Sequence, residues 1–398
     1  METLKRKQDL DRQQSKKKVA VCYPAFLGGW AEAVGLWMLQ ALQDQYDLTL
    51  FTVADVNFDR LNAMYGTQLS SQTVRVRHLV PAAWRSLCYL SIANNTNLRM
   101  LWFHGLIRQL KAHQHDYDLL ASAYNGMDLG CKGIQYLHWV NVLEATPFRH
   151  LSQFSTVQMK ENVSLTNSQF VADRIREVYG IDATVVFPPV VMKTPDLPWQ
   201  QRQEAFICSG RIAPAKEPHK VIQILKQVRD RGFDIRLALT GGGGGTYPWG
   251  YERQIHRLVQ ENADWVTLYK NLTYADYIKV MSRCKYGIHY KREPFGISIA
   301  EMVKAGLIPF VKREGGQREI VGEQNQELFF DNESDAVERI VQVLSDGNRQ
   351  QKLLASLQHQ QDLFSTDRFV HEIRQVFDRF FTTEFFTTEF FATEGEGY

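Results

Sequence analysis

Two glutamates stand eight positions apart in the segment KREPFGISIAEMVKAG, residues 291–306. Glu293 precedes a proline, which disfavours helical backbone at the residue before it, so Glu293 is predicted on a turn between a strand and a helix. Gly296 permits the backbone to approach a ligand closely. The helix is predicted to begin near Ser298, which places Glu301 in about its first turn.

Such a segment suits a polyhydroxylated ligand that carries phosphate. Carboxylate oxygens accept hydrogen bonds from vicinal hydroxyls, and the unpaired N–H groups and positive end of a helix N-terminus favour an anion. The alternative is that Glu301 only stabilises its own helix and that Glu293 is a solvated loop residue.

Composition narrows the class of protein. The chain has 398 residues, 44% hydrophobic and 23% charged, and its formal net charge of +2 gives no electrostatic argument for nucleic acid. The five cysteines form no CxxC pair, so neither a disulfide framework nor a zinc site is expected, and no metal-binding Asp-x-Asp motif is evident. The polar start has no apolar core of a secretory signal, and no window is apolar enough for a membrane span. A cytoplasmic protein is expected.

The order of the elements predicts an α/β fold. An apolar strand at 19–23, a glycine-containing loop at 26–29, an amphipathic helix and a second strand near 48–53 form a β-α-β unit, and a similar pattern restarts after a proline-bearing polar stretch. The expected organisation is a polar disordered leader at 1–17, an N-terminal Rossmann-like acceptor domain at 18–190, a linker at 191–204, a C-terminal Rossmann-like donor domain at 205–365, a C-terminal helix at 366–381 that packs back on the N-terminal domain, and a disordered repeat tail at 382–398.

Several segments together resemble one family. EPFGISIAEMVKAG resembles the E-x7-E signature of the retaining glycosyltransferases of the GT-B fold, the family 4 type, also called glycosyl transferases group 1. The resemblance covers about residues 18–365. It extends to SGRIAPAKEPHKVIQILKQV, which is similar to the Arg-x4-Lys segment, to FLGGWAEAV, to LTNSQFVADRIREVYG followed by VVFPPVV, and to EGGQREIVG.

The resemblance implies two Rossmann-like domains that face each other across a cleft, and a nucleotide-diphosphate sugar as donor. Arg211 and Lys216 are then expected to stabilise the charge on the leaving diphosphate without a metal, and no cofactor is implied. The alternative for these two is a solvated basic loop. The implied donor-binding set comprises the ribose ligand Glu301, the sugar ligand Glu293, the backbone at Phe295, Gly296 and Ile297, and the loop glycines Gly28 and Gly29.

Two further candidates are less specific. His138, in IQYLHWVN, falls at the end of a predicted strand, where the family often has a histidine near the reacting sugar, although a lone histidine is more often structural. The run Gly241–Gly245 has no lysine after it and is not a P-loop, so Gly241 and Gly242 are predicted either to line the nucleotide site or to form only a flexible turn. Many members of the family have Pro-Ser just before the E-x7-E motif, where this chain has His289 in GIHYKRE. His289 together with His138 makes the chain similar to mannosyltransferases that elongate dolichol-linked oligosaccharides.

Two segments bear on partners. Residues 82–115 combine arginines with Trp84 and Trp102 and contain no acid, which fits either a helix on an anionic membrane surface or a core helix with basic ends. The tail repeats FFTTE, FFTTE and FFATE, which indicates a poorly ordered expansion or an aromatic strip for a partner or a membrane.

The resulting hypothesis is a retaining, metal-independent hexosyltransferase. It would use GDP-mannose or a UDP-hexose, and its hydroxyl acceptor would be a glycan, a lipid-linked glycan or glycolipid, or a small molecule. His138, Glu293, Arg211 and Lys216 are the predicted catalytic residues, and the reaction is expected to be a front-face attack assisted by the departing phosphate. The alternatives are a non-catalytic sugar-nucleotide-binding scaffold at a membrane and a nucleotide-sugar epimerase of the same fold. A glycogen-type phosphorylase would need a longer chain.

Overall fold

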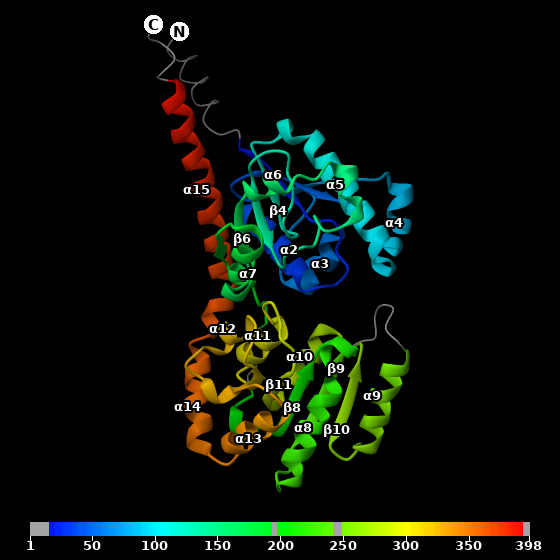
Figure 1. Ribbon diagram of the computed structural model, residues 1–398, viewed down its shortest axis with the longest axis vertical. Coiled ribbons are helices and arrows are strands. Elements are labelled where there is room, and N and C mark those ends of the chain that lie inside the picture. Colours follow the sequence, from blue (N-terminus) through cyan, green and yellow to red (C-terminus); the bar gives the residue numbers. More distant parts are fainter. Residues whose placement is uncertain (1–15, 193–196, 242–248, 393–398) are drawn as a thin grey trace. The chain divides into compact units, whose positions relative to one another are not determined.

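The computed structural model describes residues 16–192, 197–241 and 249–392 (Figure 1). The chain divides into two compact α/β units. The first comprises Met1–Leu165, Val178–Val186 and Asp367–Tyr398, and the second comprises Thr166–Glu177 and Phe187–Thr366.

This division differs from the predicted domain boundaries, because residues 166–177 and 187–190 belong to the second unit. The reason is a set of hydrogen bonds. Ser168 Oγ donates to the carbonyl oxygen of Pro294 over 2.7 Å, and the carboxylate of Glu319 accepts from the N–H groups of Gln169 and Phe170 over 2.7 and 3.0 Å. The start of helix α7 (Gln169–Tyr179) is therefore held by the second unit.

The first unit is built on a sheet of seven strands among the described residues, in the order β3-β2-β1-β4-β5-β6-β7. The pairs from β3 to β5 are parallel. Strands β1 and β4 are apolar on both faces, as expected where helices cover both sides of a parallel sheet. The strands are β1 (Lys18–Cys22), β2 (Asp47–Thr52), β3 (Val74–His78), β4 (Leu119–Ser122), β5 (Ile134–Leu137), β6 (Val163–Thr166) and β7 (Ala183–Val185).

Two apolar clusters fill the faces of this sheet. One contains Val19 and Val21 of β1, and the other contains Ala20 and Cys22 of the same strand, so alternate residues point to opposite layers. The helices of this unit are α2 (Ala31–Leu42), α3 (Phe58–Tyr65), α4 (Ala82–Asn94), α5 (Thr96–Ala112), α6 (Thr156–Lys160), α15 (Thr366–Ala392) and the 3₁₀ turns at Gln114–Asp116 and Pro147–Ser152.

Helix α15 returns to the first unit at the end of the chain. Phe369, Ile373 and Phe377 recur every four residues, are at most 1% exposed, and pack in the same cluster as Val19. Arg374 Nε donates to the carbonyl oxygen of Ala41 over 2.7 Å. The first turns of α15 thus belong to the core of this unit.

Helix α15 continues over residues 382–392 of the repeat tail, and the expected disorder of that tail stays a prediction. No glycine or proline interrupts the sequence before Gly395, so nothing in the repeat breaks the helix that the anchored turns begin. The rest of that tail, residues 393–398, and leader residues 1–15 lie outside the described residues.

The second unit has six strands among the described residues, in the order β10-β9-β8-β11-β12-β13. The paired strands run parallel. The strands are β8 (Gln203–Ser209), β9 (Arg236–Gly241), β10 (Val266–Lys270), β11 (Cys284–His289), β12 (Ile308–Lys312) and β13 (Phe329–Phe330). The helices are α8 (Pro218–Asp230), α9 (Trp249–Glu261), α10 (Tyr274–Ser282), α11 (Ile297–Lys304), α12 (Gln317–Val321), α13 (Glu333–Leu344), α14 (Gly347–Gln358) and the 3₁₀ turns at Trp199–Gln201, Pro214–Lys216, Gln326–Leu328 and Gln361–Phe364.

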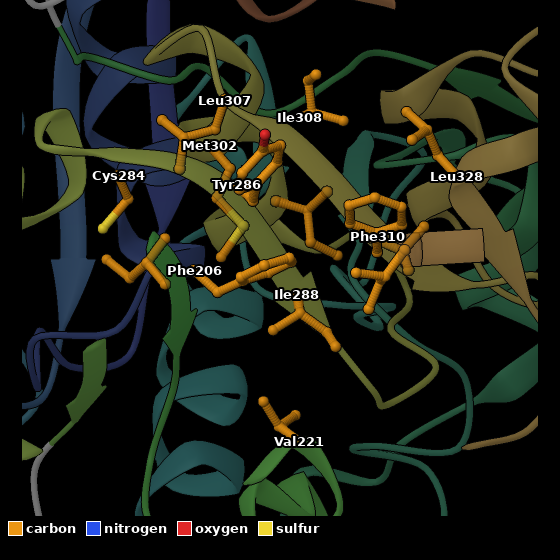
Figure 2. Packing of buried hydrophobic residues seen from close by; sticks show 14 of the residues in the cluster. Phe206, Val221, Cys284, Tyr286, Ile288, Met302, Leu307, Ile308, Phe310 and Leu328 are labelled. Atoms are coloured by element: carbon orange, nitrogen blue, oxygen red, sulfur yellow. The ribbon is translucent and has the colours of Figure 1, made fainter. Parts of the chain in front are cut away.

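The core of the second unit supports strand β11 from both sides. Figure 2 shows Tyr286 of β11 beside Phe206 of β8, and Met302 of α11 close by. The rings of Phe206 and Tyr286 stack with their centroids 4.9 Å apart. A Cβ at Gly287 would lie 2.4 Å from the sulfur of Met302, so helix α11 packs closely on this strand. Strand β11 and helix α11, which flank Glu293, are therefore rigidly joined.

We predict that Ile373→Ala destabilises the protein by about 2–5 kcal/mol, because it removes a fully buried side chain and leaves a cavity between α15 and the sheet. Urea unfolding followed by circular dichroism measures the loss. The matched control is Arg379→Ala, which truncates an exposed residue of the same helix and should change stability by less than about 0.5 kcal/mol. Equal effects of the two substitutions would contradict the packing of α15.

Candidate active site

The strand order of the second unit fixes where a ligand can bind. In a doubly wound sheet the chain leaves the first strand in opposite directions, and a crevice opens at the carboxyl ends of the two central strands. Here those strands are β8 and β11. Arg211 and Lys216 lie in the loop after β8, and Glu293 lies in the loop after β11. The predicted residues therefore come from the two loops that border this crevice.

The structure joins Glu293 and Lys216 in an ion pair. His289, the last residue of β11, places Nε2 3.0 Å from the same carboxylate oxygen of Glu293. The side chains of His289, Glu293 and Lys216 are 4%, 15% and 24% exposed. Burial alone would raise the pKa of Glu293, but the hydrogen bonds and charges of His289 and Lys216 outweigh it and lower that pKa to about 2. Glu293 is therefore ionised at neutral pH.

A pocket lies beside this ion pair. Lys216 and His289 line it together with Arg211, which is exposed, and with the backbone that follows β8. The remaining lining residues are Cys208, Ser209, Gly210, Ile212, Pro218, Leu239, Thr240, Ile255 and Leu268. The pocket combines two cations with an apolar floor. Such a lining can hold an anion at its mouth.

The turn between β11 and α11 is fixed by backbone hydrogen bonds. The N–H of Glu293 donates to Oε1 of Gln317 over 2.9 Å, and the N–H of Gly316 donates to the carbonyl oxygen of Glu293 over 2.9 Å. Gly296 has a φ of 108°, which L-residues rarely adopt, and it precedes α11 without a side-chain cap. Helix α11 begins at Ile297, one residue before the predicted start. Phe295 is 5% exposed and packs in the core, so only its backbone is available to the pocket.

Glu301 lies deeper than predicted. It is the fifth residue of α11, in its second turn, and it is completely buried. Tyr274 donates its hydroxyl to Oε1 over 3.1 Å, and Tyr277 donates to Oε2 over 3.0 Å. Burial raises the pKa of Glu301 to about 8, although the two hydroxyls act to lower it. Each carboxylate oxygen already accepts one tyrosine hydroxyl, and the role of Glu301 as the ribose ligand stays a prediction.

Gly241, at the end of β9, packs against the loop after β8. A Cβ at this position would lie 2.1 Å from the carbonyl oxygen of Gly210, so only glycine fits. The residue thus supports the backbone of the predicted diphosphate loop. Gly242 lies outside the described residues.

In the first unit, Gly28 and Gly29 lie in the loop between β1 and α2, at the corresponding switch between β1 and β4. A buried carboxylate shapes this loop. Glu32 accepts hydrogen bonds from the N–H groups of Leu27 and Gly29, the latter over 2.9 Å. The hydroxyl of Tyr65 lies 3.0 Å from Oε2 of Glu32 and 2.9 Å from the carbonyl oxygen of Gly29. These hydrogen bonds hold the loop in one conformation.

His138 follows β5 in the first unit. Its Nε2 lies 3.1 Å from the carbonyl oxygen of Ala123, and the side chain of Asn125 accepts from the N–H groups of His138 and Trp139 over 2.9 and 2.8 Å. Burial lowers the pKa of His138 to about 4, so the ring is neutral at pH 7. A neutral ring that donates Nε2–H to a carbonyl has Nδ1 as its unprotonated nitrogen.

Sequence reasoning missed the residues that hold the predicted ones in place. Gln317 and the tyrosines around Glu301 lie 24 to 27 residues from the groups they bind, and only the three-dimensional structure brings them together. Glu32 lies within the quoted FLGGWAEAV segment, but its contact with Tyr65 also depends on the fold. Outside these sites, a wider surface hollow in the first unit lies at the amino ends of β1 and β2, where Lys18 and Asp47 line it. It contains none of the predicted residues. Among the described residues, no group of three His, Cys, Asp or Glu side chains is arranged to hold a metal ion.

The architecture is similar to that of several solved structures. HepE of Anabaena, solved in complex with UDP and glucose, has a TM-score of 0.65 and 17% identity, over 91% of this chain and 100% of that one. Sucrose-phosphate synthase from Thermosynechococcus elongatus has a TM-score of 0.67 and 15% identity, over 92% of this chain and 100% of that one. The fold is GT-B. The predicted fold class is confirmed in its two α/β units with parallel sheets.

Sequence comparison finds a family match within the second unit. Residues 193–357 match the family Glycosyl transferases group 1. A curated relative, GDP-Man:Man(3)GlcNAc(2)-PP-Dol alpha-1,2-mannosyltransferase of Dictyostelium discoideum, is 22% identical over 228 residues. The match covers 52% of this chain and 45% of the relative, so the chain spans about half the length of that protein.

We predict that Glu301→Gln changes how stability depends on pH. Because the pKa of Glu301 is raised from 4.5 to about 8, the folded state favours the protonated form. The stability that this preference contributes is fully present below about pH 4.5 and is lost as the pH rises towards 8. The stability of Glu301→Gln relative to wild type should therefore rise by at most roughly 1.4 kcal/mol per pH unit across this range.

Thermal unfolding of both proteins between pH 5 and 8 measures this difference. The exposed Glu323, whose side chain is 64% accessible, provides the control substitution Glu323→Gln, which should run parallel to wild type. A difference between Glu301→Gln and wild type that stays constant with pH would contradict the raised pKa.

Proposed function

We propose that the chain is a retaining, metal-independent hexosyltransferase of the family 4 type, which moves a sugar from a nucleotide-diphosphate donor to a hydroxyl acceptor. The observation that carries the proposal is the convergence of Arg211, Lys216, His289 and Glu293 at the switch point of the second unit. The same residues lie in the part of the chain that matches glycosyl transferases group 1. The location and the chemistry therefore support the same function.

The cations would act on the leaving group. A nucleotide diphosphate gains negative charge as its bond to the sugar breaks, and Arg211 and Lys216 line the pocket where that charge would develop. Lys216 already carries its positive charge against Glu293, so the pair would be in place before the donor arrives. No metal is required for this stabilisation.

Glu293 fits the role of a positioning acceptor for sugar hydroxyls. With its pKa lowered to about 2, it is ionised and cannot donate a proton at neutral pH. One of its oxygens is engaged by both His289 and Lys216, which weakens it as a covalent nucleophile. Helix α11 begins at Ile297, four residues after Glu293 and without a side-chain cap, and the N–H groups of its first turn would meet further donor oxygens.

Retention follows from a front-face reaction. The bond between the anomeric carbon and the diphosphate oxygen breaks, and the acceptor oxygen forms its bond to that carbon on the same face. The acceptor proton passes to the departing phosphate oxygen. His138 of the first unit, neutral at pH 7, is proposed as a further catalytic residue.

The donor is proposed to be GDP-mannose or a UDP-hexose. The curated relative is named for GDP-mannose and a dolichol-linked acceptor, and the solved HepE holds UDP and glucose. These names support a lipid-linked glycan or glycolipid as the acceptor class. We propose a cytoplasmic location together with this acceptor, at the cytoplasmic face of a membrane where the acceptor is lipid-linked.

We predict that Lys216→Met lowers donor turnover by roughly 10²–10³-fold, because it removes one preorganised charge from the leaving group. Release of free nucleotide from GDP-mannose and UDP-hexoses, with and without EDTA, measures turnover. The control is Lys220→Met, which removes a lysine four positions along the chain that pairs with Glu333 rather than lining the pocket. Equal turnover in the two variants would contradict the role of Lys216.

Binding is measured separately from turnover. A donor at about 100 times its dissociation constant should add roughly 2.7 kcal/mol to the stability of the folded protein. A donor that binds without turnover in the presence of glycan and lipid-linked acceptors would support the scaffold instead. Conversion of the donor to its epimer without acceptor would support an epimerase, and a product with inverted anomeric configuration would exclude the retaining assignment.

A further inference from the structure

The loop that follows β12 closes on the turn that carries Glu293. The N–H of Gly316 donates to the carbonyl oxygen of Glu293 over 2.9 Å. A Cβ at Gly316 would lie 2.1 Å from the carbonyl oxygen of Pro294, and one at Gly315 would lie 2.7 Å from that of Glu293. The two segments therefore approach so closely that a side chain at either glycine would collide with backbone.

Gln317, the first residue of α12, is completely buried and bridges three backbone groups. Its Oε1 accepts the N–H of Glu293 over 2.9 Å, and its Nε2 donates to the carbonyl oxygens of Lys291 and Lys312 over 3.1 and 3.3 Å. Lys291 and Glu293 follow β11, and Lys312 is the last residue of β12. One carboxamide thus ties the end of β12 to the turn between β11 and α11.

These bonds occupy the side chain of Gln317 on both of its functional atoms. A carboxamide has two N–H hydrogens, and the carbonyls of Lys291 and Lys312 take both of them. An apolar side chain of similar length would leave three backbone groups without this partner, which is costly where water is excluded. Gln317 therefore acts on its surroundings through the backbone that it holds.

Both peptide groups of Glu293 are fixed by this loop. Gln317 binds its N–H and Gly316 binds its carbonyl oxygen, so the direction of the bond from Cα to Cβ is set by the loop after β12. From there the side chain reaches its ion pair with Lys216 and its hydrogen bond with His289, both through Oε1. The placement of the carboxylate consequently depends on a residue 24 positions further along the chain.

We propose that Gln317 is a positioning residue of the transfer site, which holds the backbone of Glu293 so that its carboxylate meets the donor sugar. This role rests on the proposed function, in which Glu293 accepts the hydroxyls of that sugar. A misplacement of about 1 Å can cost roughly a hundredfold in rate, so a side chain that does not touch the donor can still control turnover.

The test compares turnover of the sugar donor with binding of the nucleoside diphosphate alone. Gln317→Met should lower the release of nucleotide from GDP-mannose or UDP-hexoses roughly ten- to a hundredfold, because Glu293 is no longer held in place. Arg211 and Lys216 lie in a different loop, so the variant should bind GDP or UDP in calorimetry as wild type does. A loss of general stability would reduce both quantities in parallel.

The matched control is Gln361→Met. Gln361 also donates its Nε2–H to a backbone carbonyl, that of Val303 in α11, over 3.0 Å. The same chemical change is therefore made beside the same helix but away from the turn at Glu293. Turnover and nucleotide binding should both stay at the wild-type level.

A second variant, Gln317→Glu, keeps the acceptor and makes the donor depend on pH. An ionised carboxylate at this position still accepts the N–H of Glu293 but opposes the carbonyl oxygens of Lys291 and Lys312, whereas a protonated one donates to one of them. Burial raises the pKa of such a carboxyl, so turnover relative to wild type at the same pH should rise as the pH falls from about 8 to about 6. The corresponding ratio for Gln317→Met should stay constant.

Circular dichroism verifies that each variant is folded. Turnover of Gln317→Met equal to wild type, or a parallel loss of turnover and of nucleoside diphosphate binding, would overturn the positioning role while leaving the proposed function intact. If Gln317→Met does not fold, a turnover ratio of Gln317→Glu that is independent of pH overturns it instead. Absence of turnover by wild type would overturn the proposed function and the positioning role together.

Discussion

The ion pair between Glu293 and Lys216 is the interaction on which the arrangement of the candidate site depends. It joins the loop after β8 to the loop after β11, the two segments that border the switch point of the sheet. A buried carboxylate is costly unless its charge is balanced and its oxygens are hydrogen-bonded, and His289 and Lys216 provide both. The same contacts keep the lysine at the mouth of the pocket. The site therefore holds one cation in position before any ligand binds.

The two glutamates of one short segment have opposite electrostatic environments. Glu293 is surrounded by cationic or hydrogen-bond-donating groups, and its pKa is lowered to about 2. Glu301, eight residues further along the chain, is buried in the second turn of α11. Its hydrogen-bond partners among the described residues are neutral tyrosine hydroxyls, and burial raises its pKa to about 8. Paired acids whose pKa values are driven apart are a common feature of functional sites. The spacing alone does not produce this difference; the residues that fold around each carboxylate do.

Short sequence patterns predicted the features that depend only on neighbouring residues. The strand-turn-helix around Glu293, the glycine at Gly296 and the α/β alternation follow from proline, glycine and apolar periodicity within short windows. What the sequence could not show depends on distant partners. The burial of Glu301 requires Tyr274 and Tyr277, and the assignment of residues 166–177 to the second unit requires Glu319, about 150 residues away.

Residues 82–115 show the same limit of sequence-based prediction, here for which parts of a segment are exposed. From composition, this segment fitted a membrane helix and a core helix equally well. The structure divides the segment into two helices that meet at Asn95, which ends α4 and caps α5. Helix α5 buries Phe103, Leu106, Ile107 and Leu110, as a core helix would, whereas α4 keeps Leu87 and Leu90 in solvent. The core-helix description therefore holds for α5, and contact of this segment with a membrane stays a prediction. None of the helices in the described part of the chain is long and apolar enough to cross a membrane. An apolar face that survives on the outside of a well-packed unit has no role in holding that unit together, so its reason must be sought in what the unit binds.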